Sequence, residues 1–243
     1  MKTVLITGCS SGFGLETVRY FLDHDWKVIA TMRTPREDLF PRSEHLRVLA
    51  LDVTDPQSIQ QVVEAAGPID VLVNNAGIGM FGALEGTPME AVRGIFETNT
   101  FGTIALTQAL LPQFRQRKAG TVVNVTSSVT LKSLTLLSVY TASNAAINAF
   151  TESLALELQP FNIRVNLILP GRAPETRFGE NAQDRILIPE AYADLAKSVF
   201  AQWAQSSEIT LARDVAEAVW RAANDPSAPV RIVAGADALA LVS

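Results

Sequence analysis

Seven short runs rich in valine, isoleucine and leucine alternate with longer amphipathic stretches along this chain of 243 residues. The apolar runs cover residues 3–6, 27–31, 47–51, 70–73, 121–126, 163–169 and 231–234. Most of them lack a strict polar–apolar alternation, which is typical of strands buried on both faces of a parallel sheet. Helix-like stretches lie between them, at residues 13–24, 56–66, 88–115, 138–159 and 212–223. This order predicts an α/β fold, a doubly wound parallel sheet with helices on both faces.

One stretch interrupts the alternation, because residues 171–208 contain no strand where the order predicts one. In this architecture such an insertion lies at the carboxyl ends of the strands, where ligands bind. We therefore expect a substrate-binding lid. Its candidate lining residues are Phe178, Ile186, Leu187, Ile188, Tyr192, Phe200 and Trp203. The alternative is that these side chains pack on the sheet and close the core.

The remaining chain shows no linker or repeat, so residues 1–243 are expected to form one domain, an ordinary size for an α/β protein. Two dipeptides, Asp55-Pro56 and Thr87-Pro88, place a capping side chain before a proline and predict helix starts there.

Charge and composition exclude several classes of function. The net charge of −5 argues against nucleic acid as a partner, because phosphate recognition favours a basic face. A single cysteine, Cys9, and two histidines predict no disulfide framework and no metal site. No apolar run approaches 18 residues, so no membrane span is expected. The first strand begins at Thr3, which leaves no room for a signal peptide, and a reducing cytoplasm is the expected location.

A glycine-rich turn follows the first predicted strand and precedes the first helix. It reads Gly8-Cys-Ser10-Ser11-Gly12-Phe13-Gly14. In a Rossmann-type fold, glycines at such a turn allow a tight bend, close approach of a pyrophosphate and close packing of helix on strand. The N–H groups of the helix N-terminus then bind the phosphates. The alternative is a glycine turn that binds no ligand.

The end of the second predicted strand selects the nucleotide. NAD-binding proteins usually have an acidic residue there for the ribose 2′-hydroxyl. Here the segment Ala30-Thr-Met-Arg33 has no acid, and Arg33 suits bidentate contact with a 2′-phosphate. The sequence therefore predicts NADP(H) in preference to NAD(H), unless Arg33 is merely solvated. Asp52 and Val53, after the third strand, are expected to contact the adenine.

Five ordered motifs together resemble the short-chain dehydrogenase/reductase family. They are the glycine turn from Thr7 to Gly14, Asn74-Asn75-Ala76-Gly77, Ser127 with Tyr140, Pro170-Gly171, and Arg231 with Gly235-Ala-Asp237-Ala238. The resemblance covers nearly the whole chain. The glycine turn and the segment ending in Arg33 look most like the branch that contains 17β-hydroxysteroid and retinol dehydrogenases. The resemblance adds Asn75, Ala76, Gly77, Pro170 and Gly171 to the expected cofactor-binding residues.

The resemblance also implies catalytic roles. Tyr140 would donate a proton to a carbonyl oxygen, or accept one from an alcohol. Ser127 would hydrogen-bond the same oxygen, as a donor to a developing oxyanion does. Asn99 matches an asparagine that orders a proton-relay water. Taken without the other motifs, Ser127 could be a cap at a strand end and Tyr140 an aromatic residue at a helix start.

The sequence departs from the family at position 144. The family motif is Tyr-x-x-x-Lys, and here it reads Tyr140-Thr-Ala-Ser-Asn144. In the family this lysine binds the nicotinamide ribose and lowers the tyrosine pKa, whereas asparagine carries no charge. Three explanations are open: an active enzyme disabled by substitution, a reductase that works with asparagine, or non-redox chemistry or ligand sensing. Lys132, the nearest lysine, is not expected to replace the missing charge.

A smaller departure follows Gly171. The family has a threonine about four residues later, whereas Thr176 comes at five, so we assign it no role.

Residues between Ser127 and Tyr140 indicate the kind of substrate. Leu131, Leu134, Leu136 and Leu137 join the apolar lid candidates. Such a pocket suits a hydrophobic ketone or secondary alcohol, and arginines 172, 177 and 185 are expected to be solvated rather than to bind an acidic substrate. The expected function is NADP(H)-dependent oxidoreduction, impaired by Asn144; the alternative is a non-redox nucleotide-binding sensor or isomerase-like protein. By resemblance, we expect a homodimer or homotetramer that pairs the helices at 88–115 and 138–159.

Overall fold

A seven-stranded parallel sheet forms the centre of the computed structural model, which describes residues 1–177, 186–205 and 207–242. Its strands are β1 (Thr3–Ile6), β2 (Lys27–Met32), β3 (Leu46–Ala50), β4 (Val71–Asn74), β6 (Gly120–Val125), β7 (Ile163–Pro170) and β9 (Arg231–Ala234). Their order across the sheet is β3-β2-β1-β4-β6-β7-β9, and every neighbouring pair is parallel. All seven predicted strands are confirmed, and the fold is the expected doubly wound α/β fold.

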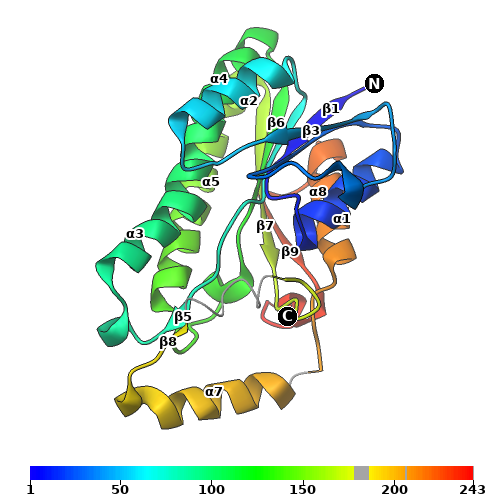
Figure 1. Ribbon diagram of the computed structural model, residues 1–243. Coiled ribbons are helices and arrows are strands. Elements are labelled where there is room, and N and C mark those ends of the chain that lie inside the picture. The colour runs from blue at the N-terminus through cyan, green and yellow to red at the C-terminus, as the bar shows by residue number, and fades with distance from the viewer. Residues whose placement is uncertain (178–185, 206, 243) are drawn as a thin grey trace.

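Helices cover both faces of this sheet (Figure 1). On one face, α1 (Gly12–Leu22) and α8 (Ala212–Asn224) bury Phe21 and Val219 against the strands. On the other face lie α2 (Pro56–Ala66), α4 (Gly102–Arg117) and α5 (Ser138–Leu158), with Leu110 and Leu154 in their shared core. The two apolar layers explain why the strands are buried on both sides.

The strand order reverses direction at β1, which lies between β2 and β4. In open α/β sheets, a crevice forms at such a switch point, outside the carboxyl ends of the strands. The glycine turn follows β1 and Asn75 follows β4, so the fold itself brings these two predicted cofactor segments together.

The predicted helix at 88–115 is interrupted. Helix α3 (Met89–Phe96) passes through a π-helical turn at Glu97–Phe101 into α4. The expected cap at Thr87 is also wrong. Its hydroxyl donates to the carbonyl of Ala83 (2.9 Å) in the preceding turn, and Pro88 is the N-cap residue. The cap at Asp55 is confirmed, because its side chain accepts from Gln57 N.

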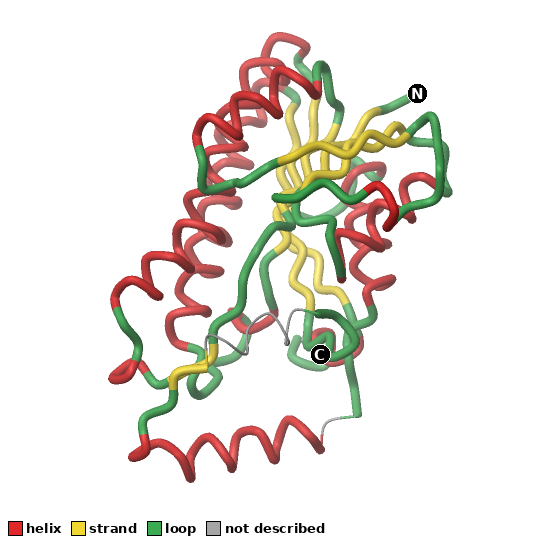
Figure 2. Tube along the Cα trace, viewed as in Figure 1, coloured by secondary structure: helices red, strands yellow, loops and turns green. Residues whose placement is uncertain are grey.

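The 171–208 insertion contains secondary structure that the sequence did not predict. Residues Ile186–Leu187 form a short strand, β8, which pairs with β5 (Phe81–Gly82) in a separate two-stranded sheet. Helix α7 (Ala193–Gln205) follows and runs along one end of the molecule, away from the main sheet (Figures 1 and 2). Phe178 and Arg185 lie outside the described residues.

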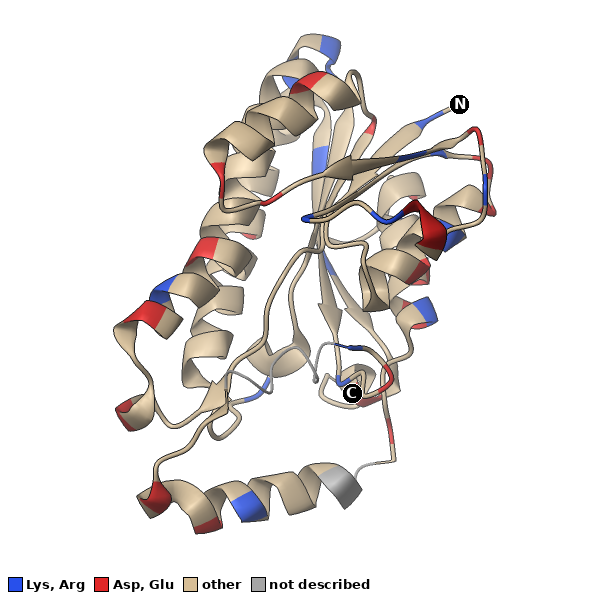
Figure 3. Ribbon diagram, in the orientation of Figure 1, with Lys and Arg blue, Asp and Glu red and all other residues tan. Residues whose placement is uncertain are grey.

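Charged residues of both signs are interspersed along the helices in the view of Figure 3. Within the described ranges, no helix combines the length and apolar character that crossing a membrane requires. The chain ends its described part with a short helix, α9 (Ala236–Leu239), beside the end of β9.

Candidate active site

The glycine turn after β1 has the backbone geometry that a phosphate site needs. Gly8 (φ +72°) and Gly12 (φ +57°) adopt left-handed conformations that side chains rarely tolerate. A Cβ on Gly14 would collide with the Gly8 carbonyl and lie 2.6 Å from Asn75 Nδ2. The N-cap residue Ser11 is extended, and its side chain caps no N–H of α1. The N-terminus of α1 therefore keeps donors for an anion, and these residues fit the pyrophosphate of a dinucleotide.

Asn75 and Thr7 hold this turn in place. Thr7 Oγ1 accepts from the backbone N–H groups of Asn75 (2.9 Å) and Ala76 (2.8 Å), while Asn75 Nδ2 donates to Thr7 O (2.9 Å). The Asn75 side chain therefore joins the ends of β1 and β4. Gly77 lies beside Asn99, since a Cβ there would be 3.4 Å from Asn99 Oδ1.

The predicted nucleotide-selecting residues lie at the ends of β2 and β3. Arg33 is exposed, and within the described part of the chain its guanidinium has no hydrogen bond or ion pair. Asp52 Oδ1 accepts from the N–H (2.9 Å) and hydroxyl (2.7 Å) of Thr54, and these bonds, with a smaller effect of Arg33, lower the pKa of Asp52. The side chain of Val53 packs against Gly102 of α4.

Tyr140 and Ser127 lie together at the carboxyl edge of the sheet. Ser127 follows β6 and is buried, and its Oγ accepts from Val129 N (3.3 Å). Tyr140 is in the first turn of α5 and packs against an apolar cluster. Burial raises the pKa of Tyr140 to about 12, and hydrogen bonds with Ser127 and Asn144 oppose this rise. The structure thus brings the predicted catalytic hydroxyls into contact.

Asn144 lies one helical turn beyond Tyr140 and is buried. Its Nδ2 donates to the backbone carbonyl of Tyr140 (2.9 Å), on its own helix. The residue therefore occupies the position of the family lysine but supplies only a neutral amide.

Asn99 lies in the π-helical turn, and its side chain joins three segments. Its Oδ1 accepts from Ile78 N (2.8 Å), and its Nδ2 donates to Ile78 O (3.0 Å) and lies 3.3 Å from Ser143 Oγ. Ser143 Oγ in turn donates to Tyr140 O (2.8 Å). This network links Asn99 to the turn that carries Tyr140. Such π-helical turns occur often at functional sites.

Ser143 and a buried chain of polar side chains were missed by the sequence analysis. Asn74 Nδ2 donates to Asn124 Oδ1 (2.8 Å) and to Thr107 Oγ1 (2.9 Å), and Asn124 Nδ2 donates to Thr151 Oγ1 (2.9 Å). These bonds run from α4 over the neighbouring strands β4 and β6 to α5, on the sheet face that both helices cover. The sequence does carry a sign of this chain, because Asn74 and Asn124 each belong to an otherwise apolar strand. A buried amide needs hydrogen-bond partners, so such residues point to other polar groups nearby.

The loop after β7 lies over the glycine turn. A Cβ on Gly12 would be 3.3 Å from Thr176 Cβ, so these two segments lie side by side. A hollow of about 200 Å³ between them is lined by Gly12, Leu15, Glu16, Arg19, Glu175, Thr176, Thr210 and Ala212. Thr176 reaches the glycine turn despite its extra residue of spacing from Gly171.

An apolar wall adjoins Tyr140. Its buried members are Phe81, Ala83, Leu136, Leu137, Ala196 and Val199, with Leu134, Ile188, Tyr192 and Trp203 packed against them. Phe81 contacts Phe200 and Trp203 at ring-centroid distances of 4.7 and 5.2 Å. Of the described lid candidates, Ile188, Tyr192, Phe200 and Trp203 therefore pack in the wall that includes Tyr140, whereas Ile186 and Leu187 form β8. Among them, Phe200 remains 40% exposed.

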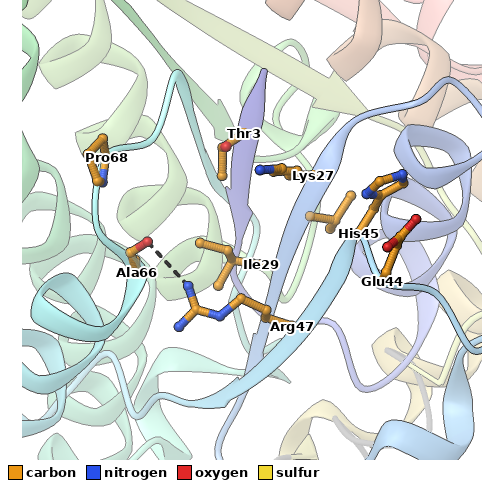
Figure 4. A pocket seen from close by; sticks show the side chains of 9 residues that line it. Thr3, Lys27, Ile29, Glu44, His45, Arg47, Ala66 and Pro68 are labelled. Carbon is orange, nitrogen blue, oxygen red and sulfur yellow. Dashed lines mark hydrogen bonds between the residues drawn. The ribbon is translucent and has the colours of Figure 1, made fainter. Parts of the chain in front are cut away.

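A second hollow, of about 300 Å³, lies at the opposite end of the strands (Figure 4). Thr3 and Lys27, the first residues of β1 and β2, form part of its lining. Arg47 donates there to the carbonyls of Ala65 and Ala66 at the end of α2. None of the predicted catalytic or cofactor-binding residues lines this hollow.

Comparison with known proteins agrees with this geometry. The protein family described as short chain dehydrogenase matches residues 2–186. Human retinol dehydrogenase 8 is 41% identical over 182 residues, which are 70% of this chain and 58% of that protein. Estradiol 17-beta-dehydrogenase 1 of Rattus norvegicus is 39% identical over 195 residues, 74% of this chain and 56% of that protein. The matched region thus spans little more than half of these two relatives.

A bacterial relative is matched over more of its length. The uncharacterized oxidoreductase YusZ of Bacillus subtilis is 37% identical over 221 residues, 85% of this chain and 79% of that protein.

Solved structures match almost the whole chain. A short-chain dehydrogenase from Streptomyces avermitilis superposes with a TM-score of 0.84 and 32% identity, over 99% of this chain and 90% of that one. The closed form of serine dehydrogenase complexed with NADP+ gives a TM-score of 0.81 and 26% identity, over 97% and 95%. With its glycine turn and its tyrosine–serine pair, the chain belongs to the short-chain dehydrogenase family.

Proposed function

We propose that this chain is an NADP(H)-dependent oxidoreductase that interconverts a hydrophobic ketone and a secondary alcohol. The observation that carries the proposal is the contact between Tyr140 and Ser127 at the carboxyl edge of the sheet, beside an apolar wall. Two hydroxyl groups in contact can hydrogen-bond one carbonyl oxygen, and the wall suits an apolar substrate.

Each residue of the site has a part in this chemistry. When bound, the nicotinamide cofactor supplies or accepts the hydride. Tyr140 donates a proton to the carbonyl oxygen, or accepts one from the alcohol, and Ser127 stabilises negative charge on that oxygen. Asn99 and Ser143 hold the helical turn that carries Tyr140. Asn144 donates hydrogen bonds but does not lower the tyrosine pKa by charge, so the proposed activity is impaired.

Arg33 supports NADP(H) over NAD(H). Its guanidinium, which has no hydrogen bond or ion pair among the described residues, follows the end of β2 and offers two parallel donors to a 2′-phosphate. Several structural neighbours contain NADP, although one contains NAD.

Replacing Arg33 with alanine tests this preference. We expect Arg33→Ala to weaken NADPH binding roughly 10- to 100-fold and to change NADH binding little, since a charged hydrogen bond contributes about 1.5–3 kcal/mol. Equilibrium titration of both nucleotides measures it. Arg36→Ala is the matched control, because Arg36 already pairs with Asp38. Equal weakening of both nucleotides by Arg33→Ala would overturn the NADP(H) assignment.

The experiment that tests the function is NADPH consumption with a panel of bulky hydrophobic ketones. The natural chain and its Asn144→Lys form are assayed side by side. Turnover of apolar ketones by either form, with little turnover of small or acidic ones, supports the proposal. Absence of turnover in both forms, with NADPH still bound, would favour the second candidate below.

The second candidate is a nucleotide-binding sensor or an isomerase-like protein that catalyses no net redox reaction. The neutral side chain at position 144 favours it, because burial raises the pKa of Tyr140 to about 12 and Asn144 carries no charge to bring it down. Its signature is tight NADP(H) binding without oxidation or reduction of any ketone or alcohol.

We also propose a homodimer or homotetramer formed through the α4 and α5 helices. Exposed apolar side chains support it, with Phe101 before α4 53% exposed and Leu156 on α5 74% exposed. Light scattering that gives the mass of one chain would overturn it.

A further inference from the structure

We propose that Thr210 and Asp237 are positioning residues that fix the loop after β7 over the phosphate site. The inference rests on the proposed function, because it concerns the binding of the same nucleotide. It is drawn from four residues that meet where β7 and β9 end: Gly171, Arg172, Thr210 and Asp237. We refer to them as the C-terminal junction.

Thr210 is the centre of the junction. It is 1% exposed and lies between α7 and α8. Its Oγ1 accepts from Gly171 N (2.9 Å) and donates to Asp237 Oδ1 (2.6 Å), and its backbone N–H donates to Arg172 O (2.8 Å). The start of the 171–208 insertion is therefore bonded directly to Thr210, which follows its end.

Asp237 completes the junction from the C-terminal helix α9. Its Oδ1 accepts from Thr210 Oγ1, and its Oδ2 accepts from Arg172 N (2.6 Å). A carboxylate with two acceptor oxygens thus binds one donor at the start of the insertion and one just after its end. Charge-assisted bonds of this kind are short and strong.

Two glycines allow these groups to approach the backbone so closely. A Cβ on Gly171 would collide with the Asp237 carboxylate, and a Cβ on Gly235 would lie 2.5 Å from Thr210 Cβ. Gly235 also has a positive φ of +96°. The motif Gly235-Ala-Asp237 and the Pro170-Gly171 pair, which lie far apart in the sequence, are therefore parts of one structure.

The junction acts on the nucleotide site through the loop that it holds. Thr176 lies five residues after Gly171, and its side chain lies next to Gly12 of the glycine turn, where a Cβ would be 3.3 Å from Thr176 Cβ. Gly12 and Thr210 also line the same hollow of about 200 Å³. If Gly171 and Arg172 are released, Thr176 loses its fixed position over the N-terminus of α1, where the phosphates would bind.

Hydrogen exchange and nucleotide titration on the full-length protein test the proposal. Thr210→Val leaves the amide of Gly171 only the longer bond to Ala234 O (3.3 Å), and Asp237→Ala removes the acceptor of the Arg172 amide. We therefore expect residue 171 in the first variant and residue 172 in the second to exchange at least about tenfold faster without nucleotide. We expect the dissociation constant of NADPH to rise about tenfold or more. Thr210→Ser keeps the hydroxyl and should restore both quantities.

Asp214→Ala is the matched control. It removes another carboxylate that accepts a backbone N–H, that of Leu211 at the start of α8, next to Thr210 in the chain. We expect it to change thermal stability without affecting exchange at residues 171 and 172 or NADPH affinity.

Each outcome is decisive. Unchanged exchange at residues 171 and 172 in both variants would overturn the junction itself. Faster exchange with unchanged NADPH affinity would show that the junction stabilises the loop but does not position it for nucleotide binding, and would overturn the proposal. A natural chain that binds no NADPH would overturn the proposed function, and with it the claim that the loop is held for this nucleotide.

Discussion

Asn144→Lys is expected to raise turnover by about two or more orders of magnitude. A unit charge about 4–5 Å from a phenol oxygen, at an effective dielectric near 20, stabilises the phenolate by roughly 3–4 kcal/mol. This corresponds to about two to three pKa units. The natural chain lacks that charge, and its Tyr140 has a pKa of about 12. Reduction and oxidation share one transition state, so both directions should accelerate together at a given pH.

The pH dependence follows from the direction of this shift. Oxidation of an alcohol needs the Tyr140 phenolate, so in the natural chain its rate should rise with pH throughout the range up to about 12. In Asn144→Lys the same rise should level off two to three units lower. Reduction needs the protonated phenol, and in the natural chain its rate should not fall between pH 7 and 10. Initial rates in both directions across this range measure the change.

Asn144→Met is the matched control for this substitution. Methionine is long and unbranched like lysine but carries no charge, so it reproduces the change of shape alone. If the methionine form gains as much activity as the lysine form, the missing charge does not explain the impairment. The same conclusion follows if neither form gains activity while NADPH still binds.

The strands and the cofactor end of the molecule could be predicted because their signals are local. The strand β4, for example, is an apolar run buried on both faces, expected at residues 70–73 and found at Val71–Asn74. Likewise, the glycine turn could be predicted because its bend needs positive φ angles, which Gly8 and Gly12 adopt. Signals of this kind depend on neighbours in the sequence and not on the tertiary fold.

The features that the sequence analysis missed depend on partners far along the chain. The π-helical turn is joined by Asn99 to Ile78 and Ser143, which are 21 and 44 positions away. Strand β8 exists because Ile186 pairs with Phe81 of β5. Both features are tertiary effects that override local preference.

Two residues predicted to bind the cofactor, Asn75 and Asp52, use their side chains to bond neighbouring parts of the protein. Asn75 was assigned to the cofactor, and its amide holds the ends of β1 and β4 together. The Asp52 carboxylate, expected to meet the adenine, accepts two bonds from Thr54. Position along the chain placed both residues at the correct edge of the sheet. Their positions in the sequence could not reveal which neighbouring groups would form hydrogen bonds with the side chains of Asn75 and Asp52.

Gly14→Ala and Gly94→Ala are expected to change the free energy of unfolding in opposite directions. At Gly14 a new Cβ would collide with the Gly8 carbonyl and lie 2.9 Å from Gly8 C, and backbone atoms cannot move aside cheaply. Forcing a methyl group into such a site costs about 1–3 kcal/mol. At Gly94, within α3, a Cβ has no neighbour within 4 Å, and alanine in a helix stabilises by roughly 0.5–1 kcal/mol relative to glycine.

Urea unfolding followed by circular dichroism measures both changes, and NADPH titration separates stability from function. The collision at Gly14 lies between helix α1 and the turn that would hold the pyrophosphate, so relief of the clash must move one away from the other. Gly14→Ala should therefore lose NADPH affinity even at temperatures where it remains folded, whereas Gly94→Ala should retain the affinity of the natural chain. Equal stability and equal NADPH affinity of the two variants would contradict this account. The close approach of Gly14 to Gly8 would then not explain why glycine is needed at position 14.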